Sequence, residues 1–288
     1  KPAGLTINRF RLTPLLQAPP ASYDLVVGSY GPLANDAGHA AKVAQVRVLP
    51  ASTPAFTANK TYRPLVGSQD ERTLIGFDWD GTLMDSEAQI VSCLHAAIAD
   101  LRLDPMDDNT VKNVIGLGLR EAVDTLVPGC DATFQQSFVQ QYRKHWFQSE
   151  SSSLFAGVRA TLDICRQHNL LLGVATGKAR CGLQRVLDET GLVDCFDATR
   201  CADETISKPH PQMLLELMEE LDISPEQTIM VGDTEYDMEM ATNAGAGKVA
   251  VSSGVHTEAR LIRHAPLVCL EGVADMPAWM AGAGIIPG

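Results

Sequence analysis

Short apolar runs alternate with amphipathic stretches from residue 73 to the end of the chain. The run TLIGF, which begins at Thr73, is followed by two acidic residues and a glycine, so it predicts a buried strand with carboxylates at its C-terminal tip. Similar runs predict strands at Leu170–Thr176, Phe196–Thr199, Thr228–Asp233, Lys248–Ser252 and Leu267–Leu270. Helical periods lie between them, at Val158–His168, Cys181–Thr190, His210–Leu221 and Asp237–Ala244. This alternation predicts an α/β fold, a doubly wound parallel sheet with helices on both faces.

The region from residue 86 to residue 154 has a different pattern, because helical periods follow one another without a strand-like run. The stretch EAQIVSCLHAAIADL places apolar side chains on one helix face, at Ile90, Val91, Leu94, Ala97, Ile98 and Leu101. Two further helical stretches run from about Leu119 to Leu126 and from about Phe134 to Phe147. We therefore predict an all-helical insertion at 86–154 within a core made of residues 71–85 and 155–284.

The first 70 residues differ from the rest in composition. They hold seven Lys and Arg against three Asp and Glu, whereas the remainder holds 16 against 32, so a boundary is predicted just before Arg72. The segment is rich in proline and contains only short apolar runs, which favours a poorly ordered extension or a small accessory strand or hairpin. Its acid-poor, Arg-containing start is also typical of an organelle transit peptide.

The charge and cysteine content narrow the choice of partners. The formal net charge of −12 argues against nucleic acid, but a metal and a lysine can make a pocket locally positive for a small phosphorylated substrate. No apolar stretch approaches the ~18 residues of a membrane helix. The seven cysteines are scattered without a C-x-x-C pair, as expected of reduced thiols. We expect a cytoplasmic monomer or homodimer, with organelle targeting left open because the chain begins at Lys1.

Two carboxylates follow the first predicted strand, in the segment Asp78-Trp79-Asp80-Gly81-Thr82. Side chains at i and i+2 of an extended segment point the same way, so Asp78 and Asp80 can face one ligand. One carboxylate can attack a phosphorus while the other transfers a proton to the leaving group and from water. The alternative is an acidic turn after a strand.

Two further clusters contain groups that bind phosphate. Thr176, Gly177 and Lys178 follow the second strand, where a hydroxyl and free backbone N–H groups can donate to a phosphoryl oxygen. Lys208, before Pro209, can neutralise a phosphate oxygen and a nucleophilic carboxylate together. A plain loop and a solvated lysine are the corresponding alternatives.

The last cluster, Gly232 to Asp237, joins a strand end to a helix start. Its carboxylates at Asp233 and Asp237 can supply oxygen ligands, directly or through water, to an octahedral cation such as Mg²⁺. An acid in the first turn of a helix also stabilises the helix dipole, so Asp237 has a structural interpretation as well.

In their order along the chain, the four clusters resemble the haloacid dehalogenase superfamily of phosphohydrolases, which has a Rossmann-like core. The family pattern D-x-D-G-T-[L/V]-x-D-S appears as the segment from Asp78 to Ser86. The family's threonine, lysine and G-D-x-x-x-D pattern correspond to Thr176, Lys208 and residues 232–237. The resemblance covers about residues 72–283 and does not reach residues 1–70.

The resemblance implies a role for each position. Asp78 would attack the phosphorus and form an aspartyl-phosphate, and Asp80 would protonate the leaving oxygen and then activate water. The phosphoryl oxygens would be held by Thr176, Gly177 and Lys208. The Mg²⁺ ligands would be Asp78, Asp80 (through its backbone carbonyl) and Asp233, with Asp237 supporting the metal site or orienting Lys208. This is positioning and charge neutralisation, as phosphoryl transfer requires.

The position of the helical insertion resembles the subgroup with a helical cap over the active site, and residues 82–86 would be its flexible junction. Within that subgroup the chain looks most like the phosphoglycolate phosphatases, on the segments 116–121 and 154–158. Arg120 is a candidate for binding a substrate carboxylate bidentately, and a surface arginine is the alternative. Lys178 carries the same two interpretations.

Several functions remain alternatives at this level. A sugar-phosphate mutase or a nucleotide or sugar phosphatase would keep every one of these residues. A haloacid dehalogenase would need neither Asp80 nor Mg²⁺, so Asp80 and Asp233 argue against it. A phospho-accepting signalling module carries its acidic pair before the accepting aspartate, which is the reverse of the order here. A binding protein without activity would not need the complete set of acidic, hydroxyl and lysine positions.

Overall fold

The computed structural model describes residues 23–24, 49–50 and 72–287, and the chain divides between Thr61 and Tyr62 into two units. In the first unit, β1 (Tyr23–Asp24) pairs antiparallel with β2 (Leu49–Pro50). The expected poorly ordered extension and transit peptide concern residues that otherwise lie outside the described ranges. The second unit contains all the candidate site residues.

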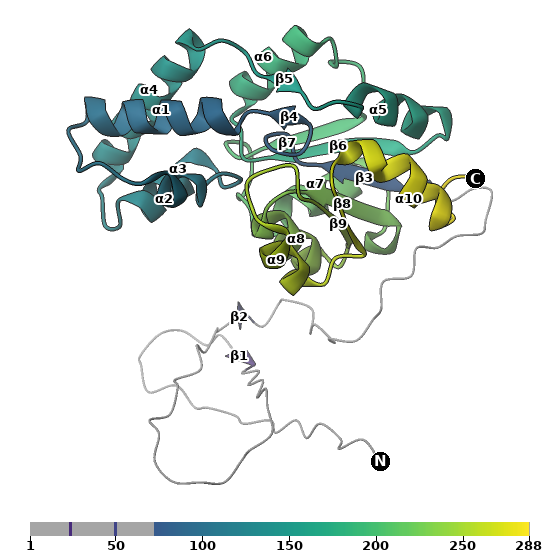
Figure 1. Cartoon of the computed structure of the whole chain (residues 1–288). Helices are drawn as coiled ribbons and strands as arrows, with labels where there is room; N and C mark the ends of the chain where they lie inside the picture. Colours follow the sequence, from purple (N-terminus) through teal and green to yellow (C-terminus); the bar gives the residue numbers. More distant parts are fainter. Residues whose placement is uncertain (1–22, 25–48, 51–71, 288) are drawn as a thin grey trace, which may run out of the picture. The chain divides into compact units, whose positions relative to one another are not determined.

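The second unit is built on a six-stranded sheet whose strands are all parallel, in the order β10-β9-β8-β3-β6-β7 (Figure 1). The strands are β3 (Leu74–Phe77), β6 (Leu171–Thr176), β7 (Ala198–Cys201), β8 (Thr228–Gly232), β9 (Gly247–Val251) and β10 (Val268–Leu270). Every residue of β3, β6 and β8 is buried, as the continuous apolar runs predicted. The predicted parallel sheet is confirmed.

Helices cover both faces of this sheet (Figure 1). On one face α5 (Val158–Gln167), α6 (Arg180–Thr190) and α10 (Met276–Gly282) enclose a core that includes Phe77 and Val174. On the other face α7 (Gln212–Leu221) and α8 (Glu235–Ala244) pack their methionines and leucines against alternate residues of the same strands. The short α9 (Glu258–Leu261) follows β9, and single turns of 3₁₀ helix occur at Pro225–Gln227, Ile262–His264 and Val273–Asp275.

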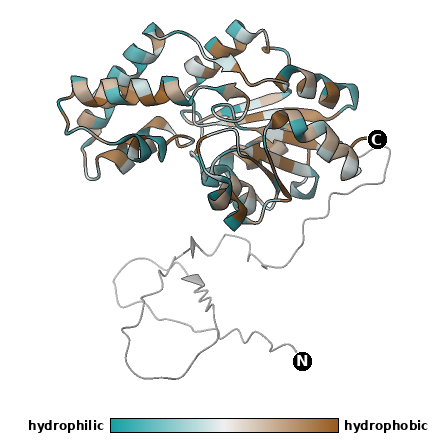
Figure 2. Cartoon of the chain, in the orientation of Figure 1, coloured by the Kyte–Doolittle hydropathy of each residue, from teal (hydrophilic) through white to brown (hydrophobic). Residues whose placement is uncertain are grey.

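Four helices lie between Asp85 and Ser153 in the sequence and are grouped beyond one end of the sheet (Figure 1). They are α1 (Glu87–Asp100), α2 (Asp108–Lys112), α3 (Leu119–Leu126) and α4 (Ala132–Gln148). The apolar face predicted for the first helix is buried from Ile90 to Ile98 in a separate hydrophobic cluster that includes Phe138. Figure 2 shows the resulting alternation of apolar and polar bands along α1. This helical segment therefore has a core of its own.

Three sequence-based expectations need correction. The segment 86–154 does not stay helical to its end, because β5 (Ser153–Leu154) pairs antiparallel with β4 (Met84–Asp85) where the chain leaves and re-enters the sheet domain. The strand expected at Phe196–Thr199 begins two residues later, because Phe196 packs against Trp79 before the edge strand starts. Finally, α2 and α10 were missed, since both are short and α10 contains a proline and a glycine.

Two general features of the described residues complete the fold. All seven cysteines are free thiols. Within the part of the chain that the structure describes, none of the helices combines the length and the apolar character needed to cross a membrane.

Candidate active site

The candidate residues meet where three neighbouring strands end. In the sheet β3 lies between β6 and β8, and Leu74 is in register with Leu171 on one side and Thr228 on the other. Asp78 directly follows β3, Thr176 ends β6, and Asp233 directly follows β8. The carboxyl ends of parallel strands form the usual ligand-binding edge of such a sheet.

A buried lysine bridges two of the carboxylates. Lys208 Nζ lies 2.7 Å from Asp78 Oδ1 and 2.6 Å from Asp237 Oδ1, and all three residues are at most 1% exposed. Burial by itself lowers the pKa of Lys208, but the Asp237 and Asp78 carboxylates outweigh this and raise the pKa above its usual value. The lysine is therefore a fixed positive charge beside the candidate nucleophile.

Asp78 remains under-neutralised despite this partner. The contact with Lys208 has the distance of an ion pair, but neither Asp78 carboxylate oxygen accepts a hydrogen bond of good geometry within residues 72–287. Burial raises the pKa of Asp78 well above its usual value; Lys208 opposes this rise, and Asp237 and Asp233 add to it. A buried carboxylate in this condition needs a further positive group.

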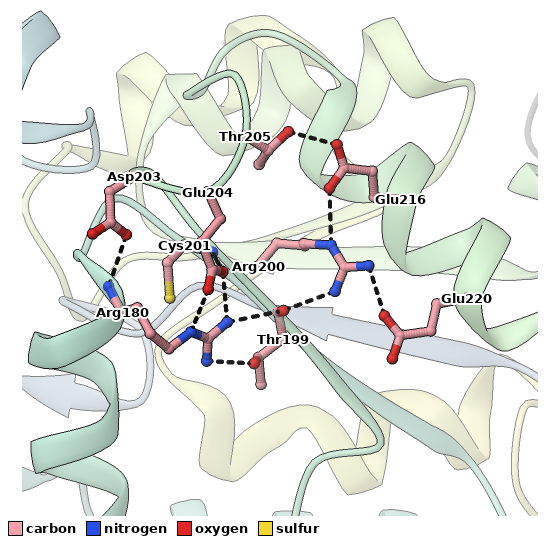
Figure 3. Close-up of polar contacts among 9 residues, drawn as sticks. All are labelled: Arg180, Thr199, Arg200, Cys201, Asp203, Glu204, Thr205, Glu216 and Glu220. Atoms are coloured by element: carbon pink, nitrogen blue, oxygen red, sulfur yellow. Dashed lines mark hydrogen bonds and ion pairs between the residues drawn. The ribbon is translucent and has the colours of Figure 1, made fainter.

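The loop that carries Lys208 is fixed by a network of ion pairs and hydrogen bonds (Figure 3). Glu204 accepts from the Cys201 backbone N–H at 3.1 Å and from Arg180 Nε at 2.7 Å, which ties the loop to the start of α6. Thr205 donates to Glu216 of α7 at 2.7 Å, and Arg200 of β7 donates to the same carboxylate at 2.9 Å. The loop therefore leaves β7 on a fixed path toward the strand tips.

Asp233 is held by residues far from it in sequence. Its Oδ1 accepts from Thr82 Oγ1 at 2.8 Å, and its Oδ2 accepts from the Val255 backbone N–H at 2.9 Å. Gly81, with φ +82°, and Gly254 pass so close to this carboxylate that a Cβ on either would clash with it. Burial and the neighbouring Asp237 carboxylate raise the pKa of Asp233 to about 7.

Asp237 is fixed at the start of α8. Thr234 is the N-cap residue, and its backbone N–H and hydroxyl donate to Asp237 Oδ2 at 3.0 and 2.7 Å. This capping box occupies one carboxylate oxygen and leaves Oδ1 for Lys208. The interpretation of Asp237 as an acid at the helix start is thus seen in the structure, and its other oxygen contacts Lys208.

Three carboxylates in this cluster suit a hard divalent cation. Asp78, Asp233 and Asp237 each offer an oxygen, and these oxygens lie within 4.8 Å of one another. Oxygen donors are the ligands that Mg²⁺ prefers, and Lys208 alone cannot balance three buried negative charges. Burial raises the pKa of both Asp78 and Asp233, and the Asp78 oxygens also accept no hydrogen bond of good geometry from residues 72–287. The residues present therefore fit Mg²⁺.

The second carboxylate of the strand tip lies apart from this cluster. Asp80 Oδ1 accepts from Ser86 Oγ at 2.5 Å and from Lys178 Nζ at 2.8 Å. The Lys178 ammonium also lies 5.0 Å from the centre of the Trp146 ring. Both hydrogen bonds go to Oδ1, so Asp80 is oriented while its other oxygen is left for proton transfer.

Thr176 and Gly177 are placed next to this pair. Thr176 is fully buried, and its Oγ1 accepts the backbone N–H of Lys178 at 3.1 Å, which leaves the hydroxyl hydrogen for a phosphoryl oxygen. Gly177 lies against the backbone of the α2–α3 loop, and a side chain there would clash with Leu117 O.

A cavity opens above these groups. Its floor, on the sheet side, is formed by Asp78, Asp80, Gly177 and Lys178, and its roof is formed by side chains of α1, α3 and α4 and by the α2–α3 loop. Arg143 of α4 lines the roof, whereas Arg120 does not: it lines a neighbouring groove between α3, α4 and the loop after β7. Of the predicted substrate-binding residues, Gly177 and Lys178 line this cavity, whereas Thr176 and Lys208 lie beside the buried carboxylates and Arg120 lies in the neighbouring groove.

Sequence reasoning missed several residues with contacts at this site. Thr82 and Ser86 lie inside the nine-residue segment that carried the resemblance, so the signal was present. Val255 contributes only a backbone N–H, which no side-chain pattern marks. Arg143 lies on a helix with no motif, so its position in the roof depends on how α4 packs.

Comparison with known proteins gives the same picture. Residues 75–251 match the family model described as haloacid dehalogenase-like hydrolase. The chain is 32% identical over 212 residues to a probable phosphatase IndB of Dickeya dadantii, covering 71% of this chain and 92% of that protein. It is 29% identical to a phosphoglycolate phosphatase of Agrobacterium fabrum, covering 69% and 88%. The crystal structure of a putative haloacid dehalogenase-like hydrolase from Bacteroides fragilis matches with TM-score 0.67 and 27% identity, covering 72% and 100%.

Proposed function

The chain belongs to the haloacid dehalogenase-like hydrolase family, whose relatives here are named phosphatases, and we propose that it is a Mg²⁺-dependent phosphatase acting through an aspartyl-phosphate on Asp78. The substrate is a monoester of phosphoric acid and a small metabolite. The observation that carries the proposal is the buried cluster in which Lys208 bridges Asp78 and Asp237 beside Asp233. A cluster with more acidic than basic side chains can hold an anionic phosphate only when a cation is bound as well.

In the first step an Asp78 carboxylate oxygen attacks phosphorus and the bond from phosphorus to the ester oxygen breaks. Asp80 delivers a proton to that leaving oxygen, so the organic group departs as an alcohol. Lys208 neutralises charge on the phosphoryl oxygens, and the Thr176 hydroxyl donates a hydrogen bond to one of them. Ser86 and Lys178 keep Asp80 in the orientation that this proton transfer needs.

In the second step Asp80, now a carboxylate, accepts a proton from water as the water oxygen attacks the phosphorus of the aspartyl-phosphate. The acyl–phosphate bond breaks, inorganic phosphate is released, and Asp78 returns as a carboxylate. One water is consumed for each ester cleaved, and Asp80 returns to its protonated form. The two steps therefore return the enzyme to its starting state.

Asp78, Asp233 and the backbone carbonyl of Asp80 would hold Mg²⁺, with Asp237 supporting it. Bound there, the cation supplies charge neutralisation that lets the anionic carboxylate and the anionic phosphate approach each other. The hydrogen bonds from Thr82 and Val255 fix the Asp233 oxygens in advance, so little reorganisation is needed.

We further propose that residues 86–154 act as a cap over a core made of residues 71–85 and 155–284. The helical segment is fastened to the core by polar contacts near the site. Tyr236 Oη donates to Asn113 O at 2.7 Å, and the Gly118 N–H donates to Ser207 Oγ at 2.7 Å. Release of these contacts would open the cavity, and their formation would exclude water from the phosphoryl transfer.

The direct test is release of inorganic phosphate from a panel of phosphorylated metabolites that includes 2-phosphoglycolate, with and without a chelator. We expect turnover in Mg²⁺ and loss of turnover when the metal is removed. A mutase would convert its substrate without releasing phosphate, so the phosphate assay separates the two reactions. Phosphate release that is insensitive to chelator would contradict the proposed mechanism.

A further inference from the structure

The roof of the cavity is largely aliphatic where it faces the floor. The side chains come from α1, from the loop between α2 and α3, and from the start of α3. They are Ile90, Leu94, Val114, Ile115, Leu117 and Leu119. Most of them also belong to the hydrophobic cluster of the helical segment, so they are held in place by that core.

The part of the roof contributed by α4 is aromatic. Tyr142, Trp146 and Phe147 line the cavity beside the aliphatic group. Burial raises the pKa of Tyr142 well above its usual value, so the phenol stays neutral. Phe147 is 49% exposed, and its ring centre lies 5.2 Å from that of Trp146.

The cations near this roof belong to α4, to α6 and to the floor and not to its aliphatic part, and the Arg185 guanidinium of α6 lies 4.8 Å from the centre of the Trp146 ring. Lys178 belongs to the floor, where Asp80 holds it at 2.8 Å and the Trp146 ring lies beside it. Arg143 is exposed and makes no ion pair or hydrogen bond among residues 72–287. A carboxylate or a row of hydroxyls placed against the aliphatic roof would lose its water without gaining partners there, which is unfavourable.

We infer that this site takes phosphate monoesters whose organic group is apolar, an aryl-alkyl or branched alkyl chain that packs against the aliphatic and aromatic roof. The inference rests on the proposed phosphatase function and names its substrate class. It departs from the expectation of a phosphoglycolate-like substrate, whose organic group is a short carboxylate. Pockets that bind a ligand mainly through apolar walls with a few polar groups at one end are common.

The test compares three alkyl phosphates in Mg²⁺: 2-phenylethyl phosphate, ethyl phosphate and 2-phosphoglycolate. Phenylethanol and ethanol are leaving groups of similar acidity, so a difference between the first two reports binding of the organic group. We expect kcat/KM to be at least about tenfold higher for 2-phenylethyl phosphate than for either of the others, mainly through a lower KM.

A variant and a matched control test whether the roof causes the preference for 2-phenylethyl phosphate. Phe147→Ala removes an exposed ring of the roof, and we expect the preference for 2-phenylethyl over ethyl phosphate to fall about fivefold. Ile262→Ala removes an apolar side chain that is 53% exposed and lies outside the cavity, and we expect no change. Equal effects of both variants would overturn the assignment of the roof.

The non-hydrolysable 2-phenylethylphosphonate and ethylphosphonate separate this inference from the proposed function. Calorimetry on the Mg²⁺-loaded protein should show tighter binding of the phenylethyl compound. If none of the three esters is hydrolysed but this binding preference holds, the phosphatase proposal fails and the apolar site stands. If ethyl phosphate or 2-phosphoglycolate is hydrolysed as well as 2-phenylethyl phosphate, the phosphatase proposal stands and the apolar substrate class is wrong.

Discussion

The floor and the roof of the cavity have opposite chemistry although both belong to one unit. The floor rests on buried charges, in which Asp78, Lys208 and Asp237 are each almost fully excluded from solvent. The roof offers aliphatic and aromatic side chains from α1, α3, α4 and the α2–α3 loop. Buried charges are costly and are kept where they act on a reacting group, whereas apolar walls are easily varied. We therefore expect the floor to carry the reaction and the roof to select the substrate.

The largest effect is expected from removing the nucleophile in the floor. Asp78→Asn replaces a carboxylate by an amide that cannot form an aspartyl-phosphate, so phosphate release should fall by at least about 10³-fold. The fold should tolerate the change, because this carboxylate is buried beside two others. The matched control is Asp85→Asn, an exposed carboxylate in the same segment, which should keep its activity. Unchanged turnover in Asp78→Asn would contradict the mechanism in which Asp78 is the nucleophile.

The next effect concerns the charge balance of the floor. Lys208→Met leaves the Asp78 and Asp237 carboxylates without their ammonium partner, so the free energy of unfolding should fall by about 3–5 kcal/mol along with activity. Lys144→Met, which breaks a solvent-exposed ion pair with Asp100 in the roof helices, should cost less than about 1 kcal/mol. Urea unfolding of both variants makes the comparison, and equal losses would mean that the buried pair has no special role.

The third effect is a difference in how the stability of the metal-free and the Mg²⁺-bound protein depends on pH. In the folded protein the pKa of Asp233 is about 7 against 3.8 for an ordinary aspartate, so the folded state binds more protons between these values. The stability that this group contributes to the metal-free protein is therefore fully present below pH 3.8 and is lost as pH rises toward 7. Mg²⁺ competes with that proton, so it should raise Tm by at least about 2 °C at pH 8 and by less at pH 5. Equal shifts at both pH values would contradict this, and Asp233→Asn should abolish the difference.

The smallest effect belongs to the roof. Arg143 lines the cavity, while Arg120 lines only the neighbouring groove. On a chain of net charge −12, a cation near the mouth attracts an anionic phosphate ester. Arg143→Gln should lower kcat/KM about threefold at low salt and less at high salt, and Arg120→Gln should change it less. A larger loss in Arg120→Gln would restore Arg120 as the candidate for substrate binding.

Much of the floor could be predicted because its residues follow buried strands. An apolar run that ends in polar residues is a local pattern, so the positions of Asp78, Thr176 and Asp233 at strand tips followed from the sequence. A parallel sheet then brings such tips to one edge. The roof gave no comparable signal, because an amphipathic helix shows which face is buried but not which residue of its other face meets the floor. Arg120 and Arg143 are both arginines on helices, and only the packing of α3 and α4 distinguishes them.

The sequence by itself determined the α/β alternation, the helical interruption and the order of the four polar clusters, because each depends on residues close together in the chain. Only the tertiary structure decided which oxygens meet which donors. Thr82 and Asp233 are 151 positions apart, and their hydrogen bond exists because β3 and β8 are neighbours in register. Lys208 reaches Asp78 and Asp237 because the loop after β7 is held by an ion pair to α6 and a hydrogen bond to α7. Contacts of this kind depend on the register of strands and the direction of side chains, which no single segment of the chain contains.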